Sequence, residues 1–186
     1  MKKEIEVKIK LNKGEREKVR LKLNEFSSAT PLVKETTYGF FTEDKQSIEK
    51  GIFPRIKEFQ NNNEGLLTVK VKKENNKDYF RRDKYEIKIN DVKFFRDFLK
   101  IVGYGREIIF EKERESWKIP DSVLVNLDIL PFGEFVEIEG EPEQIEKMVK
   151  DLGLENRERT IKAYLALWDD YRKENNISEE NCLFKN

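Results

Sequence analysis

The stretch EIEVKIK, residues 4–10, decides the fold of this chain. Its apolar residues occupy odd positions and its charged residues occupy even positions, without a break. Because successive side chains of a β-strand point to opposite faces, this period predicts a strand with one apolar face and one ionic face. The ionic face begins with two carboxylates, Glu4 and Glu6, followed by Lys8. The rest of the chain must decide whether that face meets water or the inside of the molecule.

Alternation of the same kind recurs along the chain and predicts eight strands in all. They cover residues 3–11, 33–42, 52–60, 65–73, 79–89, 105–116, 122–130 and 134–140. Helical spacing of apolar residues predicts helices at residues 13–25, 91–101, 142–152 and 160–174. Short turns between the strands predict an α+β domain built on an antiparallel sheet. Eight strands are also enough to close a narrow β-barrel.

The composition excludes several kinds of site. The chain has 37 Lys+Arg and 37 Asp+Glu among 186 residues, so its formal net charge is zero and no overall field attracts nucleic acid or membranes. It has no His, and its single Cys is Cys182. Histidine-based catalysis, an internal disulfide and thiolate zinc sites are therefore excluded. A metal ion would have oxygen ligands, which suits Mg²⁺, Mn²⁺ or Ca²⁺.

The ionic faces of the predicted strands are segregated by sign. Carboxylates concentrate on the first, seventh and eighth strands, as Glu4, Glu6, Asp128, Glu137 and Glu139. Bases dominate the third to sixth strands, as Arg55, Lys57, Lys70, Lys72, Arg82, Lys84, Lys112 and Arg114. The simplest interpretation is a sheet with one face in water. A merely solvated face should mix the signs, however, because like charges opposite each other destabilise a sheet.

A metal-bound polyphosphate would satisfy both groups of charges. Carboxylates two residues apart on neighbouring strands can converge on a divalent cation. Lysine and arginine from several strands can surround phosphate oxygens, and arginine can do so through two hydrogen bonds at once. Without ions or a ligand, a closed sheet with such faces turned inward would be very costly to form.

The charged positions also follow the pattern of a known family. Glu4-x-Glu6-x-Lys8 resembles the E-x-E-x-K motif of the CYTH family, the triphosphate tunnel metalloenzymes. Further similarities come in chain order: PRIK at 54–57, LTVK at 67–70, Arg82 with Glu86, EKER at 111–114, LD at 127–128 and FGEFVEIE at 132–139. The last segment is the most specific, and the resemblance extends from residue 4 to about residue 168.

The resemblance implies an eight-stranded antiparallel tunnel with a charged interior and helices packed outside. It implies a site for Mg²⁺ or Mn²⁺ made by Glu4, Glu6, Asp128, Glu137 and Glu139. It also implies a triphosphate held by Lys8, Arg55, Lys57, Lys70, Arg82, Lys112 and Arg114. The catalytic centre would comprise Glu4, Glu6, Lys8, Glu137 and Glu139. Glu86 is either a further acid near the metal or the partner of a basic neighbour.

Two segments depart from the family pattern. ETTYGFF at 35–41 stands where many members have an Asp-x-Tyr-Phe strand; the aspartate is absent and Gly39 interrupts the strand. Pro54 and Lys57 replace a leucine and a second arginine in the third strand. Lys72 and Lys84 have the parity of the inward-facing bases and are expected near the mouth of the tunnel. The departures at 35–41, Pro54 and Lys57 keep the phosphate-binding pattern, but they leave the identity of the organic part of the substrate open.

Three functions fit the charged interior. Hydrolysis of a triphosphate, inorganic or organic (for example thiamine triphosphate or a nucleotide), is favoured, because a metal-activated water needs no histidine base. The alternative is a class IV-type adenylate cyclase that converts ATP to cyclic AMP and pyrophosphate. The third is a non-catalytic polyphosphate- or nucleotide-binding module, against which the five carboxylates argue.

Residues 1–175 are expected to form one domain, followed by a polar, flexible tail at 176–186. The N-terminus has no apolar signal-peptide core, and no stretch approaches the roughly 20 apolar residues of a membrane span. We therefore expect a cytoplasmic protein with a small-molecule triphosphate as its partner, and neither nucleic acid nor membrane. Tyr164, Leu165 and Trp168 are expected in the core rather than at an interface, and a monomer or a homodimer both remain open.

Overall fold

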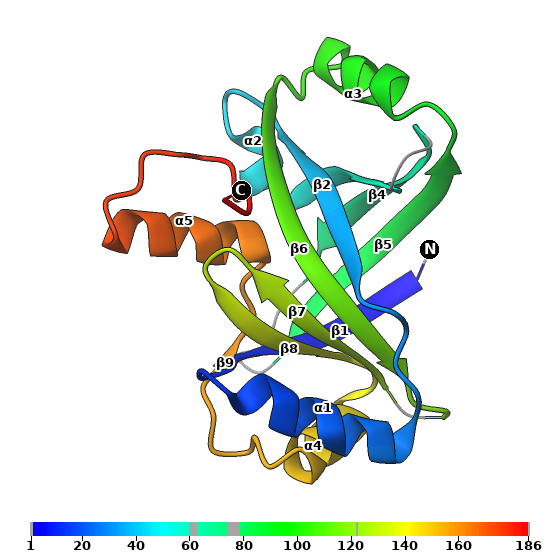
Figure 1. Cartoon of the computed structure of the whole chain (residues 1–186). Coiled ribbons are helices and arrows are strands. Elements are labelled where there is room, and N and C mark those ends of the chain that lie inside the picture. The colour runs from blue at the N-terminus through cyan, green and yellow to red at the C-terminus, as the bar shows by residue number, and fades with distance from the viewer. Residues whose placement is uncertain (1, 60–62, 74–78, 122, 186) are drawn as a thin grey trace.

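A computed structural model describes residues 2–59, 63–73, 79–121 and 123–185 of the chain. The predicted ends of two strands, at residues 60 and 122, and the turn at 74–78 lie outside the described residues. Eight strands form the wall of the molecule (Figure 1): β1 Lys2–Lys10, β2 Val33–Phe41, β3 Ile52–Glu58, β4 Gly65–Lys72, β5 Phe80–Ile89, β6 Arg106–Lys118, β7 Leu124–Leu130 and β8 Gly133–Glu139.

The eight strands close into an antiparallel barrel. Their order is β5-β4-β3-β2-β6-β7-β8-β1, and β1 pairs again with β5 to complete the circle. Glu4 lies opposite Arg82 in the β1–β5 pair, and Lys8 lies opposite Glu137 in the β1–β8 pair. Side chains of alternate residues therefore face the inside of the barrel on every strand. The predicted α+β barrel is confirmed.

Five helices among the described residues surround the barrel: α1 Glu15–Phe26, α2 Gln46–Glu49, α3 Val92–Ile101, α4 Pro142–Asp151 and α5 Tyr164–Glu174. α1 and α4 lie side by side below β1, β7 and β8, whereas α3 lies at the opposite end (Figure 1). The Asp91 carboxylate accepts a hydrogen bond from the Phe94 backbone N–H and so caps the N-terminus of α3. None of these helices is long and apolar enough to cross a membrane.

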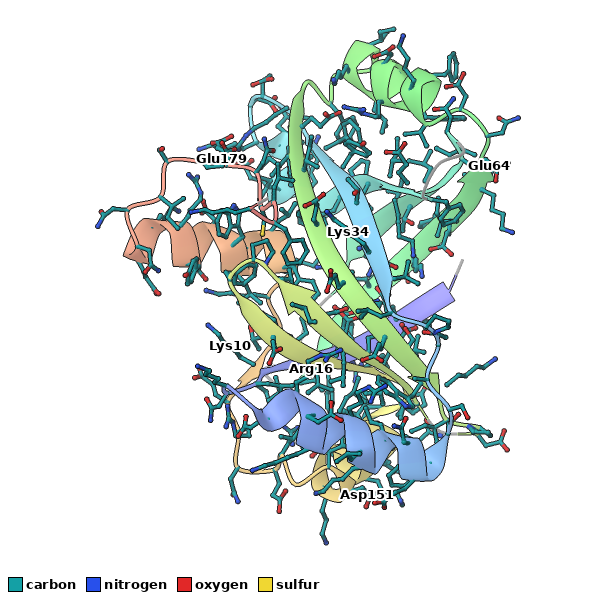
Figure 2. All side chains as sticks on the ribbon, viewed as in Figure 1. Lys10, Arg16, Lys34, Glu64, Asp151 and Glu179 are labelled. Atoms are coloured by element: carbon teal, nitrogen blue, oxygen red, sulfur yellow. The ribbon has the colours of Figure 1, made fainter. Side chains whose placement is uncertain are left out.

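The largest core lies between the barrel and the helices α1 and α4. Val7 and Ile9 of β1 pack there with Leu23 of α1 and Ile145 of α4, and all four side chains are fully buried. The odd residues of the opening stretch therefore face outward to the helices, which leaves its charged residues facing inward. On the same outer side, Arg16 of α1 donates to the Glu115 carboxylate of β6 at 2.5 Å (Figure 2).

Two short elements have no counterpart in the sequence prediction. α2 has only four residues, and β9, Arg159–Thr160, adds a two-residue strand beside β1. β9 occupies the start of the predicted helix at 160–174, so α5 begins only at Tyr164. Both elements are too short for a hydrophobic period to show in the sequence.

The polar C-terminal segment is attached to the barrel rather than detached from it. Cys182 is fully buried, and its backbone exchanges hydrogen bonds with Ile109 and Glu111 of β6 at 2.9 and 2.8 Å. The indole N–H of Trp168 on α5 donates to the Glu180 carbonyl at 2.8 Å. The polar composition predicts a loose tail, but these contacts are made by backbone groups, which composition does not reveal.

Candidate functional site

The inner faces of the strands surround one cavity of about 870 Å³. Eleven of the twelve predicted site residues line it: Glu4, Glu6, Lys8, Arg55, Lys57, Lys70, Arg82, Lys112, Arg114, Glu137 and Glu139. The twelfth, Asp128, lies behind Arg114 and outside the set of described residues that line the cavity. The parity of the strand residues therefore places charged side chains of both signs inside the barrel.

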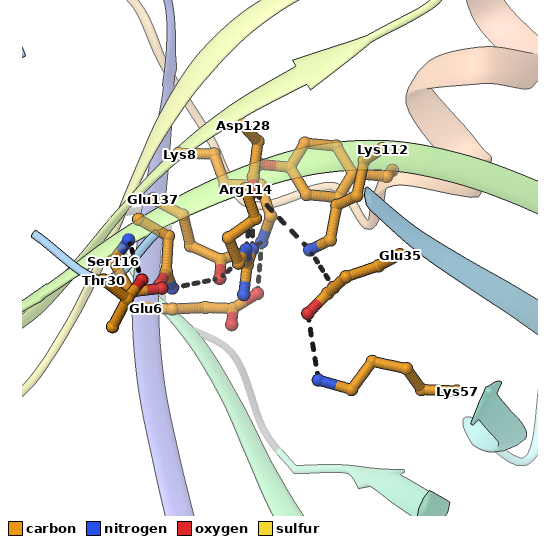
Figure 3. Close-up of polar contacts among 12 residues, drawn as sticks. Glu6, Lys8, Thr30, Glu35, Lys57, Lys112, Arg114, Ser116, Asp128 and Glu137 are labelled. Atoms are coloured by element: carbon orange, nitrogen blue, oxygen red, sulfur yellow. Dashed lines mark hydrogen bonds and ion pairs between the residues drawn. The ribbon is translucent and has the colours of Figure 1, made fainter. Parts of the chain in front are cut away.

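One side of the cavity is a compact network of ion pairs (Figure 3). The Arg114 guanidinium donates to both oxygens of Asp128, each at 2.5 Å, and to Glu137 at 2.9 Å. The Lys8 ammonium pairs with Glu137 at 3.2 Å and makes a short contact with Glu6. Five charged side chains from β1, β6, β7 and β8 are thus joined into one continuous network.

The ion pairs in this network fix the charges of its members. Burial alone would raise the pKa of Glu137, but Arg114 and Lys8 hold it well below its usual range. Burial would likewise lower the pKa of Lys8 and of Arg114, yet the neighbouring carboxylates raise both. Glu137, Lys8 and Arg114 therefore each have a partner that offsets the cost of desolvation, whereas burial and the adjacent Arg114 lower the pKa of Lys112.

The opposite side, on β3, β4 and β5, has a surplus of cations. Burial and the neighbouring Arg55 lower the pKa of Lys70 to about 8, even though its ammonium lies 2.5 Å from Glu4. Burial lowers the pKa of Arg82 to about 10. Lys70 also lies directly opposite Lys84 in the β4–β5 pair, where like charges destabilise a sheet. Additional negative charge is therefore favourable at this wall.

Glu35 on β2 joins the cavity although sequence reasoning did not assign it to the site. Its carboxylate lies 3.0 Å from the Lys57 ammonium and 3.5 Å from the Lys112 ammonium. Burial would raise the pKa of Glu35, but Lys112 and Arg114 lower it to about 2. Strand parity could have identified Glu35, because it lies on the same face of β2 as Thr37 and Gly39, which also line the cavity.

Two further expectations concern residues near the β4–β5 end of the cavity. Glu86 pairs with Lys84 at 3.0 Å, so the second of its two expected roles, the partner of a basic neighbour, is the one observed. Lys72 and Lys84 both line the cavity, and Lys72 is exposed. Both lysines are therefore available to an anion that enters from this end.

Gly39 does not interrupt β2, in which it pairs with Arg55 and Ile108, but the position has a physical reason to be a glycine. A Cβ atom at this position would lie 2.9 Å from Cδ1 of Leu165, which is on α5. The absence of a side chain lets α5 approach the barrel wall, and Leu165 lines the cavity as a result. The departure from the family pattern at 35–41 thus accompanies a close contact between β2 and α5.

The carboxylates offer oxygen ligands for a divalent cation without forming a ready cluster. Glu6 and Glu139 lie directly opposite each other in the β1–β8 pair, and both line the cavity. Like charges in this position are unfavourable unless a cation lies between them. Among the described residues, no three carboxylates lie close enough together to hold a metal ion. These carboxylate oxygens are suitable ligands for a hard cation. In this structure the Lys8 ammonium contacts Glu6 and the Lys70 ammonium contacts Glu4.

Comparison with known proteins agrees with this arrangement. The chain matches the CYTH domain over residues 2–164. The PH1819 protein from Pyrococcus horikoshii OT3 has 26% sequence identity and a TM-score of 0.73, with 91% of this chain and 99% of that chain covered. A search of curated proteins finds no match.

Two more distant solved structures share the fold. The HpAC1 protein from Hippeastrum has 16% identity and a TM-score of 0.67, covering 92% of this chain and 96% of that one. A candidate adenylate cyclase from Vibrio parahaemolyticus has 16% identity and a TM-score of 0.65, covering 89% and 97%. The match over residues 2–164, on a closed barrel with a charged interior, shows that this chain belongs to the CYTH domain family.

Proposed function

We propose that this protein is a divalent-metal-dependent phosphohydrolase that binds a triphosphate, inorganic or organic, inside its barrel. The observation that carries the proposal is the unequal distribution of charge in the cavity. Lys70 and Arg82 are buried and have lowered pKa values, so an anion next to them would gain their full electrostatic attraction. A triphosphate is compact, highly charged and rich in acceptor oxygens, which matches this wall.

The basic residues would bind and orient the phosphate chain. Arg55 and Arg82 can each donate two hydrogen bonds to phosphate oxygens, whereas Lys70 acts as a point charge. Because these groups come from three neighbouring strands, the barrel holds them in place before the substrate arrives. Such preorganised charge stabilises the negative charge that develops during phosphoryl transfer.

The acidic residues around Glu6 and Glu139 would hold Mg²⁺ or Mn²⁺, with Glu4 and Glu137 as neighbours on the same strands. A divalent cation bound there would neutralise phosphate charge and activate water. Asp128 fits a different role, because both of its oxygens accept hydrogen bonds from Arg114. We therefore assign it to the orientation of Arg114.

One of the solved structures of this fold supports hydrolysis of a triphosphate over cyclisation of ATP. The Hippeastrum protein, a candidate adenylyl cyclase of this fold, is described as having a dominant triphosphatase activity. At 16% identity that protein indicates what the fold can do, and the reaction of this chain needs its own measurement.

The test is to incubate the purified protein with Mg²⁺ or Mn²⁺ and, separately, with tripolyphosphate, ATP and thiamine triphosphate. We expect release of orthophosphate. Cyclic AMP with pyrophosphate would instead identify a cyclase, and binding without turnover would identify a non-catalytic module. Either outcome would contradict the proposal.

A matched pair of variants tests the metal assignment. Glu139→Gln removes one carboxylate from the cavity, and Glu134→Gln makes the same change on β8 at a position outside the described cavity lining. We expect Glu139→Gln to abolish activity and to weaken Mn²⁺ binding measured by electron paramagnetic resonance. If Glu139→Gln behaved like Glu134→Gln in both measurements, the metal assignment would be wrong.

A further inference from the structure

Tyr164, the first residue of α5, reaches from outside the barrel into the network of buried ion pairs. Its hydroxyl donates a hydrogen bond to Oδ2 of Asp128 at 2.6 Å. Its ring centroid lies 5.4 Å from the Lys8 ammonium and 5.4 Å from the Lys112 ammonium. The ring also packs edge-on against Phe135, with centroids 5.4 Å apart. One side chain thus contacts a carboxylate and two cations of the candidate site.

Asp128 transmits this contact to Arg114. The Asp128 side chain is fully buried, and each of its oxygens accepts a hydrogen bond from the Arg114 guanidinium. Arg114 lines the cavity, whereas Asp128 and its hydrogen bonds lie behind it. The orientation of the guanidinium toward the cavity therefore depends on how Asp128 is held. The Tyr164 hydroxyl helps to hold it, because it donates to the same Oδ2 atom that accepts from Arg114, and Tyr164 also lines the cavity.

An ordinary core tyrosine would not need this geometry. The aromatic cluster around Tyr164, which includes Phe110, Phe132, Phe135 and Trp168, would be filled equally well by the ring of a phenylalanine. The hydroxyl adds a short hydrogen bond to a charged, buried acceptor, and such bonds are among the stronger ones in proteins. Burial and the adjacent Asp128 raise the pKa of Tyr164 well above its ordinary value, so the hydroxyl remains a donor at neutral pH.

We propose that Tyr164 is a positioning residue of the triphosphate site, which orients Arg114 toward the cavity through Asp128. The inference rests on the proposed function, because it concerns how the same cavity binds a triphosphate. It adds α5 to the site: of the seven cations expected to hold the phosphates, Tyr164 contacts Lys8 and Lys112 directly and Arg114 through Asp128. α5, which lies outside the barrel, would thus help to shape the anion-binding surface within it.

The test compares Tyr164→Phe with Tyr171→Phe. Tyr171 is on the same helix and is not among the described residues that line the cavity. Its ring packs against Phe132 and Trp168, so the control removes a hydroxyl without touching Asp128. Each change is also made in an Arg114→Lys background. Tripolyphosphate binding is measured by calorimetry without metal, and thermal unfolding checks that the variants fold.

We expect Tyr164→Phe to weaken tripolyphosphate binding about tenfold, the size expected for one hydrogen bond to a charged group. In the Arg114→Lys background the same change should have little further effect, because the hydroxyl acts through Arg114. Tyr171→Phe should leave binding unchanged in both backgrounds. Wild-type affinity in Tyr164→Phe, or an equal loss in both backgrounds, would overturn the proposal.

Two further outcomes separate this inference from the function on which it rests. If the wild type binds tripolyphosphate but hydrolyses nothing, the proposed function fails while the binding comparison still tests Tyr164. If the wild type does not bind tripolyphosphate, both proposals are overturned. Should Tyr164→Phe fail to fold, Asp128→Asn replaces it as the variant, with the same tenfold weakening expected and wild-type affinity as the contradicting result.

Discussion

Charged side chains line both sides of the cavity, but the balance between cations and carboxylates differs from one side to the other. On the side of β1, β6, β7 and β8, the neighbouring carboxylates raise the pKa values of the buried cations Lys8 and Arg114, whereas burial and Arg114 lower the pKa of Lys112. On the side of β3, β4 and β5, burial lowers the pKa of Lys70 to about 8 and that of Arg82 to about 10. Carboxylates thus compensate Lys8 and Arg114 on the first side, and the second side favours an added anion.

This difference indicates which side of the cavity contributes more to the stability of the fold and which contributes more to the binding of a triphosphate. Removing one partner from a complete buried pair leaves an uncompensated charge, which is costly. Removing a cation from a crowded basic wall relieves repulsion between neighbours, so it should cost little stability. The first side should therefore contribute most to the stability of the fold. The second side should supply most of the affinity for a triphosphate, to which Arg114 adds from the first side.

The largest effect is expected from Arg114→Ala, which leaves Asp128 and Glu137 without the guanidinium that binds both. We expect the free energy of unfolding to fall by about 3–5 kcal/mol. Urea unfolding measures this change. The matched variant on the basic wall is Arg55→Ala, which should alter stability by less than about 1 kcal/mol and weaken tripolyphosphate binding. Equal losses of stability in the two variants would remove the distinction between the sides.

A smaller effect is expected from the pH dependence of Lys70. Its pKa is about 8 in the folded protein, below the ordinary value of 10.5. Between these values the unfolded chain binds more protons, so the stability of the wild type should rise as the pH increases from about 8 to about 10.5. The rise is on the order of 3 kcal/mol, since each unit of pKa is worth about 1.4 kcal/mol.

Lys70→Met should remove that rise, and Lys72→Met should keep it, because Lys72 is an exposed lysine on the same strand. The measurement is urea unfolding of the three proteins at pH 7.5, 9 and 10. If the free energies of unfolding of the wild type and Lys70→Met changed in parallel over this pH range, the lowered pKa of Lys70 would be contradicted.

The smallest effect concerns the contact between β2 and α5, whose residues Gly39 and Leu165 both line the cavity. Gly39→Val would place side-chain atoms against Leu165 and should destabilise the protein by about 1–3 kcal/mol. Leu165→Ala makes room, so the double variant should recover about 1 kcal/mol of that loss. Thermal unfolding of the single and double variants gives the coupling. Strictly additive effects would show that Gly39 does not serve this contact.

The sequence could reveal the barrel and most of its lining because strand parity is a local property. Alternation at residues 4–10 was enough to place Glu4, Glu6 and Lys8 on one face, and the partner strands repeat the rule. Parity cannot show which charges meet across the cavity. The bond between Tyr164 and Asp128 joins residues 36 positions apart, and sequence reasoning assigned the tyrosine only to the core.

The other differences between the sequence-based predictions and the structure also arise from tertiary contacts. Glu35 was not assigned to the site because its strand departs from the family pattern, although its parity agrees with an inward position. The C-terminal segment was expected to be loose because its residues are polar. The side-chain oxygen of Asn181 accepts a hydrogen bond from the Ile109 backbone N–H, however, and the backbone of Cys182 pairs with β6. Backbone pairing of this kind has no compositional signature.

The most direct test of the unequal charge distribution in the cavity is a crystal structure of the protein with tripolyphosphate bound. The account predicts phosphate oxygens within hydrogen-bonding distance of Arg55, Lys70 and Arg82 on the basic wall. It also predicts that the pairs of Arg114 with Asp128 and Glu137 remain intact. A tripolyphosphate that bound outside the barrel, or that broke the Arg114 pairs and left Lys70 and Arg82 without a phosphate contact, would contradict it.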